Sequence, residues 1–600
     1  MRLGARAAAL VGALSLACGG APPRPTSAAA PAWRAASEEA FAEAAREDRL
    51  VLLSVQADWC HWCHVMNATT FADPDVRRLL DEGFVTVRAE EGARPDLAER
   101  YGNWGWPATI VFAPDGTEIL RLRGYRDPVA MRAILETLLA DLRAHAPLGA
   151  TLEGHVAPSG SEAPRELAEA RAIVRAQLDG LYDRREGGWG DEQRYPFDAL
   201  VRHALVRGRE EGDARATERG LRSLARYTEL IDPVDGGMYQ YSDGDWAHPH
   251  YEKLAEIQAG AIEALAEAYA STHDERWVRA AGELTRYLDT TLTSPDGTFY
   301  ASQDADLRSD ESLVPGAVYY ALDAGERRAR GTPRIDTHVY ASVGGRLAAA
   351  LARWGAVRAD AEAVHRAERC VRAIDSAQRD ERGLYLHEAS ESDDGVRYLA
   401  DQAEMLRALV ALHQATGDPT WAVAASALAD RTLEVLGDEA SHALFSRTPG
   451  RDPTEAPTLP IEDGAVVARM LLALSVIEHR PDRVEQARAI LGGLASPRAL
   501  AAAGRKVGEY AIALELSAQD PVALTVVGDP AAAATGRLVR AAVDYAEPRA
   551  VLVWQTSEEG EYPFDPGTPA LYVCSSVSCS EPITDPARVR ERLDAFFERE

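Results

Sequence analysis

The sequence predicts a multidomain α/β and all-α protein, with a small α/β domain first, a ring of helix pairs next and a small α/β appendage last. Three observations support this order. A Cys-x-x-Cys pair near residue 60 stands between a strand pattern and a helix pattern, a regularly interrupted helical period covers residues 164–500, and strand-like runs return in residues 501–600. A length of 600 residues allows about two to four domains, and 46% hydrophobic residues are enough for sizeable cores.

The amino terminus is typical of an exported protein. Arg2 and Arg6 precede an apolar stretch, 7–17, that is too short to span a bilayer, so residues 1–17 are predicted to be a signal peptide. Nothing later in the sequence has the length of a transmembrane helix.

The residues after this stretch predict an anchor and a tether. Residues 15–19 (SLACG) resemble the lipobox of bacterial lipoproteins, which implies a lipid on Cys18; loss of Cys18 with a simple signal is the alternative. Residues 18–33 are rich in Pro, Ala and Ser and predict a flexible tether. We therefore expect a periplasmic or envelope-anchored lipoprotein that meets the membrane only through its lipid. The net charge of −29 argues against nucleic acid or an anionic membrane surface as a partner.

The Cys-x-x-Cys pair is placed as dithiol chemistry requires. It follows an apolar run, 50–55, typical of a buried strand, and precedes a predicted helix over 65–80. Free N–H groups at the start of a helix stabilise a thiolate, so Cys60 is the predicted nucleophile. Cys63, one turn later, can resolve a mixed disulfide on Cys60. The supporting residues are expected to favour the thiolate when the histidines are protonated and to shield it with the indoles: Trp59, His61, Trp62 and His64.

Other interpretations of the motif remain open. C-x-x-C-H is also the attachment signature of c-type haem, one C-x-x-C is half of a common zinc site, and the pair could be a plain structural disulfide. The strand before the motif and the helix after it favour dithiol redox chemistry. On that basis we expect no cofactor and no metal.

The elements after the motif follow the thioredoxin order. They are a strand at 84–89, two strands at 109–113 and 118–122 joined by a Pro-Asp-Gly turn, and a helix at 127–142. Trp106 and Pro107 stand just before the third strand, where a cis-proline of that fold faces the dithiol and positions the bound chain; an ordinary strand-entry proline is the alternative. We predict a thioredoxin-like domain over 34–146 and a linker over 147–163.

Residues 164–500 predict an (α/α)6 toroid of six helix hairpins. Five polar breaks, each with an Asp that can cap the following helix, recur at 211–213, 272–274, 358–360, 416–418 and 480–482. A ring of hairpins buries the two apolar ends that an open stack would expose. The appendage is assigned to 501–600, where Cys574 and Cys579 either pair with each other or form a relay with the Cys60 site.

The returns between hairpins predict a carbohydrate pocket. Aromatic and carboxylate side chains in a concave mouth suit a sugar or another polyol, although aromatics that simply plug the ring are the alternative. The candidates are Trp189, Tyr239, Trp246, His248, His250, Glu252, Lys253, Tyr300, Asp304 and Asp306. Lys253 is singled out because, with Lys506, it is one of two lysines in the chain, and a buried amine can lose its proton. We expect one pocket to hold His250, Glu252, Lys253, Asp304 and Asp306, with a structural salt bridge as the alternative.

Several motifs together resemble the spermatogenesis-associated protein 20-like thioredoxin-domain family. They are CHWCHVM (60–66), RPD (94–96), GWP (105–107), HPHYEK (248–253), FYASQDAD (299–306) and YVCSSVSCSEPITDP (572–586). The resemblance implies a thioredoxin-like domain followed by a six-hairpin glycosidase-like toroid, and it implies no particular reaction.

The sequence therefore predicts a thiol-disulfide oxidoreductase-like protein whose thioredoxin domain is fused to a toroid with a candidate carbohydrate site. Its expected partners are protein thiols or disulfides, together with a carbohydrate. The alternative is a toroid that binds, isomerises or hydrolyses glycans, with the thioredoxin domain as a docking module. A c-type cytochrome, through the CHWCH sequence, is a more remote alternative.

Overall fold

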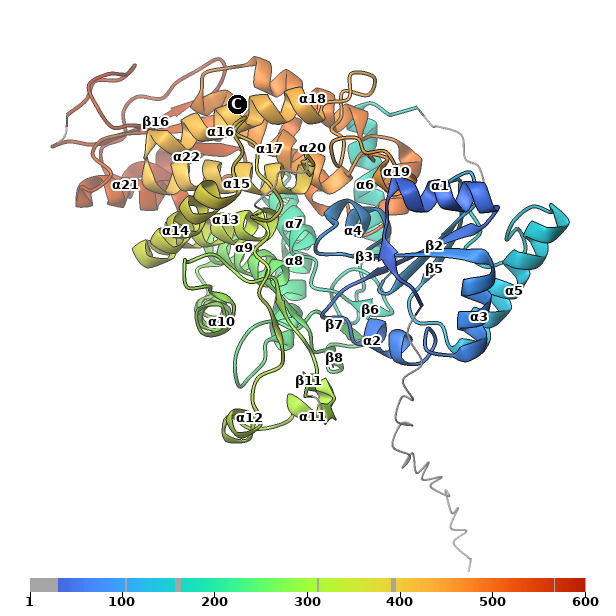
Figure 1. Ribbon diagram of the computed structural model, residues 1–600. Coiled ribbons are helices and arrows are strands. Elements are labelled where there is room, and N and C mark those ends of the chain that lie inside the picture. The colour runs from blue at the N-terminus through green and yellow to red at the C-terminus, as the bar shows by residue number, and fades with distance from the viewer. Residues whose placement is uncertain are drawn as a thin grey trace, which may run out of the picture.

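The computed structural model describes residues 31–102, 105–156, 163–309, 312–389, 395–565 and 567–598. The predicted signal peptide and Cys18 lie outside these ranges. Figure 1 shows a mixed α/β domain beside a large group of helices, with the last residues on the far side of that group. Within the described ranges, no helix combines the length and the apolar character needed to cross a bilayer.

The first domain is built on a five-stranded sheet. Its strands are β1 (Arg34–Ala35), β2 (Leu50–Gln56), β3 (Phe84–Glu90), β4 (Ala108–Phe112) and β5 (Glu118–Arg123). The spatial order is β1-β3-β2-β4-β5, with β1, β3 and β2 parallel and β4 and β5 antiparallel to their neighbours. Every residue of β2 is buried, which explains why the strand is apolar except for Ser54 and Gln56.

Helices cover both faces of this sheet. They are α1 (Glu38–Glu47), α2 (His61–Ala68), α3 (Pro74–Gly83), α4 (Pro95–Tyr101) and α5 (Pro128–Ala144). Apolar residues of α1 and α4 form one core cluster with the sheet, and those of α2, α3 and α5 form another. The thioredoxin-like α/β arrangement expected from the sequence is therefore present.

Two local expectations were wrong. The single helix predicted over 65–80 is divided into α2 and α3, because Asp73 caps a new helix by accepting from the Asp75 and Val76 amides and Pro74 occupies its first turn. Part of the predicted linker extends the sheet instead: the Arg121 amide donates to the Gly154 carbonyl over 3.0 Å.

The described helices after residue 163 form a closed double ring. The inner helices are α7 (Asp198–Glu210), α9 (Ala255–Thr272), α13 (Ala341–Arg358), α15 (Leu399–Thr416), α17 (Ile461–Ile477) and α20 (Gly508–Ser517). The outer helices are α6 (Leu167–Leu181), α8 (Ala214–Tyr227), α10 (Glu275–Tyr287), α14 (Ala361–Gln378), α16 (Pro419–Leu436) and α18 (Asp482–Gly493). Each inner helix packs on the next, and α20 packs on α7, which closes the (α/α)6 toroid.

The helix α20 lies in the segment that the sequence assigned to the appendage. The helix α20 packs between the inner helices α17 and α7, and it also contacts the outer helix α6. It therefore completes the sixth inner–outer helix pair together with α6. We therefore propose that the toroid extends to about residue 520.

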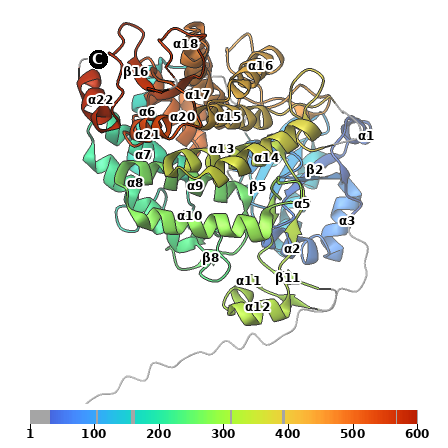
Figure 2. The ribbon, with the colours of Figure 1, turned by 90° about the vertical axis from the view of Figure 1, so that its left-hand side faces the viewer.

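The remaining residues form a small α/β unit. It contains β14 (Val522–Val527), β15 (Ala550–Gln555), β16 (Ala570–Cys574), α21 (Ala533–Val543) and α22 (Val589–Phe597). Cys574 forms a disulfide with Cys579. In both ribbon views β16 lies at the opposite side of the molecule from α2, so a relay between these cysteines and Cys60 has no structural support (Figures 1 and 2).

The aromatic returns share one construction. Each joins the end of an outer helix to the residues before an inner helix through an isolated β-bridge: Tyr182–Trp189, Ile231–Met238, Thr293–Phe299, Arg379–Tyr385 and Gly437–Leu444. Trp189, Tyr239, Phe299 and Tyr385 are all buried. At these positions the aromatic residues fill the ring rather than line an open pocket.

One return is anchored by a buried ion pair. The strands β9 (Lys253–Leu254), β10 (Ser302–Gln303) and β13 (Ile335–Asp336) form a small sheet. From it the Lys253 ammonium donates to Asp232 over 2.8 Å and to the Gly236 carbonyl over 2.7 Å. Burial lowers the pKa of Lys253 to about 8 although Asp232 opposes the shift. Arg327 also binds Asp232, over 2.6 Å. Lys253 is therefore a structural residue in this arrangement.

We expect Lys253→Met to lower the free energy of unfolding by about 3 kcal/mol, because it leaves part of a buried ion network without its partner. Thermal or denaturant unfolding measures this. The control Arg330→Met removes a cation from an exposed position on the neighbouring helix α12 (Ala324–Arg330) and should change stability little. An unchanged stability for Lys253→Met would contradict the structural role.

Candidate functional site

The two cysteines of the motif lie where the sequence places them, at the start of α2. Cys60 is the N-cap of α2 and is disulfide-bonded to Cys63. The Cys63 amide also donates to the Cys60 sulphur over 3.1 Å. The Trp106–Pro107 peptide bond is cis. These features have the layout of a thioredoxin-type dithiol site.

The dithiol is covered by the toroid. Cys60 is 4% exposed and Cys63 is 1% exposed. Together with Trp59, both belong to the same continuous apolar cluster as Trp189 and Tyr239 of the toroid returns. Cys60, the predicted nucleophile, therefore faces the second domain rather than solvent.

Acidic side chains of the toroid meet the first turn of α2. The His61 Nδ1 atom lies 2.8 Å from an Asp306 carboxylate oxygen, and His64 Nε2 lies 3.9 Å from Asp304. The guanidinium of Arg308 binds Asp306 over 2.9 Å and lies 3.6 Å from Asp304. We call this contact between α2 and residues 252 and 304–308 the seam.

The seam shifts the pKa values of its titratable groups in different directions. The hydrogen bond to Asp306 raises the pKa of His61, although burial opposes this. Burial lowers the pKa of His64. Burial would also raise the pKa of Asp306, but its bonds from His61 and the Gly316 amide outweigh that effect and the net shift is downward. The seam therefore favours a charged His61 beside a charged Asp306.

Two further carboxyl groups in the seam have raised pKa values. Burial raises the pKa of Asp304 to about 6. Burial also raises the pKa of Glu252, whose Oε2 atom has no hydrogen-bond partner in the described structure. A protonated Glu252 avoids repulsion with a thiolate formed at the start of α2.

The single pocket expected for His250, Glu252, Lys253, Asp304 and Asp306 is not formed, because neighbouring residues along the strand point to opposite sides. Lys253 pairs with Gln303 across β9 and β10, and successive residues of a strand point to opposite faces. Lys253 turns inward to Asp232, whereas Glu252 and Asp304 turn toward α2. The cation between Asp304 and Asp306 is therefore Arg308. The prediction that Lys253 shares their pocket was wrong.

The remaining candidates lie outside the seam. His250 lies 3.0 Å from Asp243 and stacks on Tyr241, and the largely exposed His248 lies 2.9 Å from Asp245. The buried Trp246 donates to the Glu186 carbonyl, and Tyr300 is half-buried. Within the motif, Trp59 is buried and donates to Glu91, whereas Trp62 is 43% exposed and packs on Tyr125.

The sequence analysis missed the cations that join the domains. Arg308 stands two residues after the QDAD sequence and could have been included on that ground. Arg334 binds Asp58 over 2.9 Å across 276 positions in the chain, which no local pattern could indicate.

The first domain also covers other returns of the toroid. Asp96 and Arg447 form a buried ion pair of 3.3 Å, and Arg94 donates to the Thr454 carbonyl over 3.0 Å. Burial, with repulsion from Glu90 and Glu256, raises the pKa of Glu91 to about 8. Near this group is Lys506, whose pKa is lowered by burial although Glu256 and Glu99 oppose the shift. The charge of Lys506, from the toroid, also acts on Glu91 of the thioredoxin-like domain and opposes the rise in its pKa.

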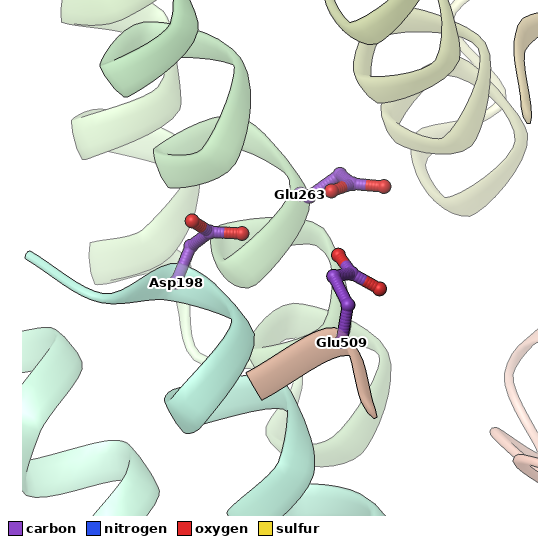
Figure 3. Close-up of side chains that lie close together, drawn as sticks. All are labelled: Asp198, Glu263 and Glu509. Carbon is purple, nitrogen blue, oxygen red and sulfur yellow. The ribbon is translucent and has the colours of Figure 1, made fainter. Parts of the chain in front are cut away.

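A cluster of acids at the toroid centre is compensated by arginines. Asp198, Glu263 and Glu509 come from α7, α9 and α20, and Figure 3 shows their carboxylates turned toward one another. The Arg202 guanidinium lies 3.0 Å from Asp198 and 3.4 Å from Glu263, and it also binds Glu509. Arg407 pairs with Glu263 and Glu509 as well. The cluster is an ion network that links inner helices.

Comparisons with known proteins find a family match in the first domain and sequence similarity over about half of the chain. Residues 26–142 match a family described as Thioredox_DsbH, protein of unknown function, DUF255. Spermatogenesis-associated protein 20 from Homo sapiens is 27% identical over 325 residues, covering 48% of this chain and 41% of that protein. The Mus musculus protein is 26% identical over 321 residues, covering 48% of this chain and 40% of that protein. The matched region thus spans less than half the length of these curated relatives.

Other similarities concern separate parts of the chain. Thiol:disulfide interchange protein DsbD 2 from Pseudomonas aeruginosa is 36% identical over 103 residues, covering 16% of this chain and 17% of that protein. A sugar epimerase from a ruminal bacterium superposes with a TM-score of 0.43 and 12% identity, over 55% of this chain and 86% of that one. A GH76 α-mannanase from Bacteroides thetaiotaomicron superposes with a TM-score of 0.41 and 9% sequence identity, over 58% of this chain and 96% of that one. The chain thus joins a thioredoxin-like domain that matches the DUF255 model to an (α/α)6 toroid, and over about half of its length it is similar to spermatogenesis-associated protein 20.

Proposed function

We propose that this protein is a thiol-disulfide oxidoreductase whose dithiol is covered by the toroid at the seam. The observation that carries the proposal is the disulfide-bonded Cys60–Cys63 pair at the start of α2. The cis-proline Pro107 precedes β4, which lies next to β2 in the sheet. This sheet and proline around the pair favour dithiol chemistry over haem attachment.

The exchange requires two steps. The Cys60 thiolate attacks one sulphur of a partner disulfide, and the other partner sulphur leaves as a thiolate. Cys63 then attacks the Cys60 sulphur of the mixed disulfide, which releases the second partner thiol and oxidises the protein pair. A protonated His61 stabilises the Cys60 thiolate, and Trp106 with Pro107 positions the partner chain.

A protein partner reaches Cys60 only when the seam opens. His61–Asp306 holds the seam closed, and Asp58–Arg334 joins the two domains beside it. The seam would therefore restrict exchange with large partners. As in the sequence analysis, we place the protein outside the cytoplasm, in the periplasm or anchored to the envelope through Cys18, where disulfides persist.

A second candidate function concerns the toroid mouth. Glu91, with its pKa raised to about 8, would offer a proton donor, and the Lys506 amine and the Trp106 ring both border Gly102 at the domain contact. Such groups, close to Trp106, suit the hydroxyls of a carbohydrate. Calorimetric titration with mannose and cellobiose tests this. We expect heat of binding that Lys506→Met abolishes; the absence of heat with every sugar in a broader panel would contradict it.

We expect Cys63→Ser to accumulate mixed disulfides with protein partners through Cys60, because the resolving thiol is missing. Non-reducing electrophoresis and peptide mass spectrometry measure the adducts. Cys60→Ser is the matched control and should accumulate none with proteins. If protein adducts form on Cys63 in the control instead, the assigned roles are reversed.

We expect Asp306→Asn to expose Cys60 to large reagents. In a Cys63→Ser background, the measured quantity is the rate at which a polymer-linked maleimide alkylates Cys60, divided by the rate at which iodoacetamide alkylates it. Because both reagents react with the thiolate, the ionised fraction of Cys60 cancels in this ratio. This ratio should rise in Asp306→Asn. Asp245→Asn removes the acid of the exposed His248 pair, away from the seam, and should leave the ratio unchanged.

The same ratio should depend on pH. Docking against the toroid raises the pKa of His61. Protonated His61 therefore stabilises the closed seam fully at pH values below the pKa of a free histidine, about 6.5. This stabilisation is lost as the pH rises through the raised pKa of His61 in the closed seam. The unmodified seam should therefore open with rising pH, whereas Asp306→Asn should show little such change. A ratio independent of pH in both proteins would contradict the role of this pair.

A further inference from the structure

A cavity of about 420 Å³ lies beside the dithiol, on the side of Cys63. It is placed at the carboxyl ends of the parallel strands β1, β2 and β3, where open α/β sheets commonly bind ligands. The lining residues that matter here are Trp33, Asp58, Cys63, Asn67, Arg88 and Glu90. Cys60 is not part of this wall. The volume is within the range of small-molecule sites.

Of the two arginines that line the cavity, Arg34 pairs with Glu43 but Arg88 lacks an acidic partner. Arg88 donates to the Asn67 side-chain oxygen over 2.8 Å, and its guanidinium lies 4.5 Å from the Trp33 ring centre. Among the described residues no carboxylate lies within ion-pairing distance of Arg88, and its Nε–H has no acceptor. Burial lowers the pKa of Arg88. A half-buried guanidinium without a counter-ion favours an anionic ligand.

The acids of the cavity are already engaged. Asp58 binds Arg334 over 2.9 Å. Glu90 accepts from the Asp58 amide over 3.3 Å and from the Ala93 amide over 2.8 Å. Burial also raises the pKa of Glu90, which disfavours its charged form. Arg88 is therefore the group of the cavity that an anionic ligand would complement, and a carboxylate is such an anion.

We propose that this cavity binds a small thiol, or its disulfide, that carries a carboxylate, and that it exchanges with the dithiol at Cys63. The proposal rests on the redox function proposed above and adds a second substrate class to it. Small thiols would meet Cys63 from the cavity, while protein partners would meet Cys60 after the seam opens. The dithiol would then pass electrons between the two sides.

The reaction balances with two ligand thiols. The first, as thiolate, attacks Cys63; the Cys60–Cys63 bond breaks and Cys60 leaves as a thiolate at the helix start, where the Cys63 amide binds its sulphur. The second ligand thiolate attacks the ligand sulphur of the mixed disulfide, which gives the ligand disulfide and a Cys63 thiolate. The two thiol protons end on Cys60 and Cys63, and two electrons pass to the protein pair.

Binding is essential to this route. Cys63 is 1% exposed, so a thiol that only collides with the surface reacts poorly. A thiol held by Arg88 remains beside the sulphur and profits from its high local concentration. The route therefore predicts discrimination between thiols that differ in charge.

The test measures reduction of the oxidised full chain by 3-mercaptopropionate and by the neutral 2-mercaptoethanol, at equal thiolate concentrations. Alkylation and mass spectrometry of the peptide with Cys60 and Cys63 give the rates. Arg88→Gln should slow 3-mercaptopropionate about tenfold and 2-mercaptoethanol less than about twofold, since a charged hydrogen bond is lost. The control Arg78→Gln makes the same change on the exposed face of α3 and should affect neither rate.

A second variant covers a folding failure of Arg88→Gln. Asn67→Asp supplies Arg88 with a fixed carboxylate and should cause the same selective loss. Equal slowing of both thiols, or no slowing of either, in the folded variants would overturn the carboxylate site. If even dithiothreitol fails to reduce the pair in the unmodified protein, the redox function itself is wrong.

The point of attachment gives an independent readout. Cys60→Ser treated with the disulfide of 3-mercaptopropionate should form an adduct on Cys63 faster than Cys63→Ser forms one on Cys60. The opposite order would overturn the Cys63 route.

Discussion

The contact between His61 and Asp306 is the interaction on which the arrangement of the dithiol depends. It joins the first residue of α2 to a return of the toroid, 245 positions later in the chain. Asp306 is itself fixed by the Gly316 amide and by Arg308. Because Cys60 immediately precedes His61, the contact that fixes His61 also holds the proposed nucleophile against the toroid.

The charges of the seam follow from this contact. A carboxylate near a helix N-terminus is favoured by the helix dipole, but it competes with a thiolate for the same positive end. The seam limits that competition, since burial favours neutral Glu252 and raises the pKa of Asp304 to about 6. Asp306 keeps its charge and is paired with His61. His61 and Arg308 therefore offset the negative charge that the toroid brings close to the dithiol.

Much of the fold could be predicted because its signals are local. A strand pattern, two cysteines and a helix pattern indicate the thioredoxin-like domain, and the Asp breaks between helices indicate the ring. The role of α20 was missed because this ten-residue helix follows the apparent end of the repeat and joins the ring only through tertiary packing. The candidate site was predicted only in part for a similar reason. The sequence indicated that the HPHYEK and QDAD returns meet, but not that alternation along β9 turns Lys253 away from Glu252. The pairing of His61 with Asp306 depends on how two domains dock, which no local pattern encodes.

Hydrogen exchange of the oxidised full chain tests the docked dithiol most directly. The account predicts slow amide exchange in two peptides, one over α2 and one over residues 302–308, because each covers the other. It also predicts that Asp306→Asn accelerates exchange in both peptides together while the β2 amides stay protected. Fast exchange of either peptide in the unmodified protein, or acceleration confined to one of them, would contradict the account.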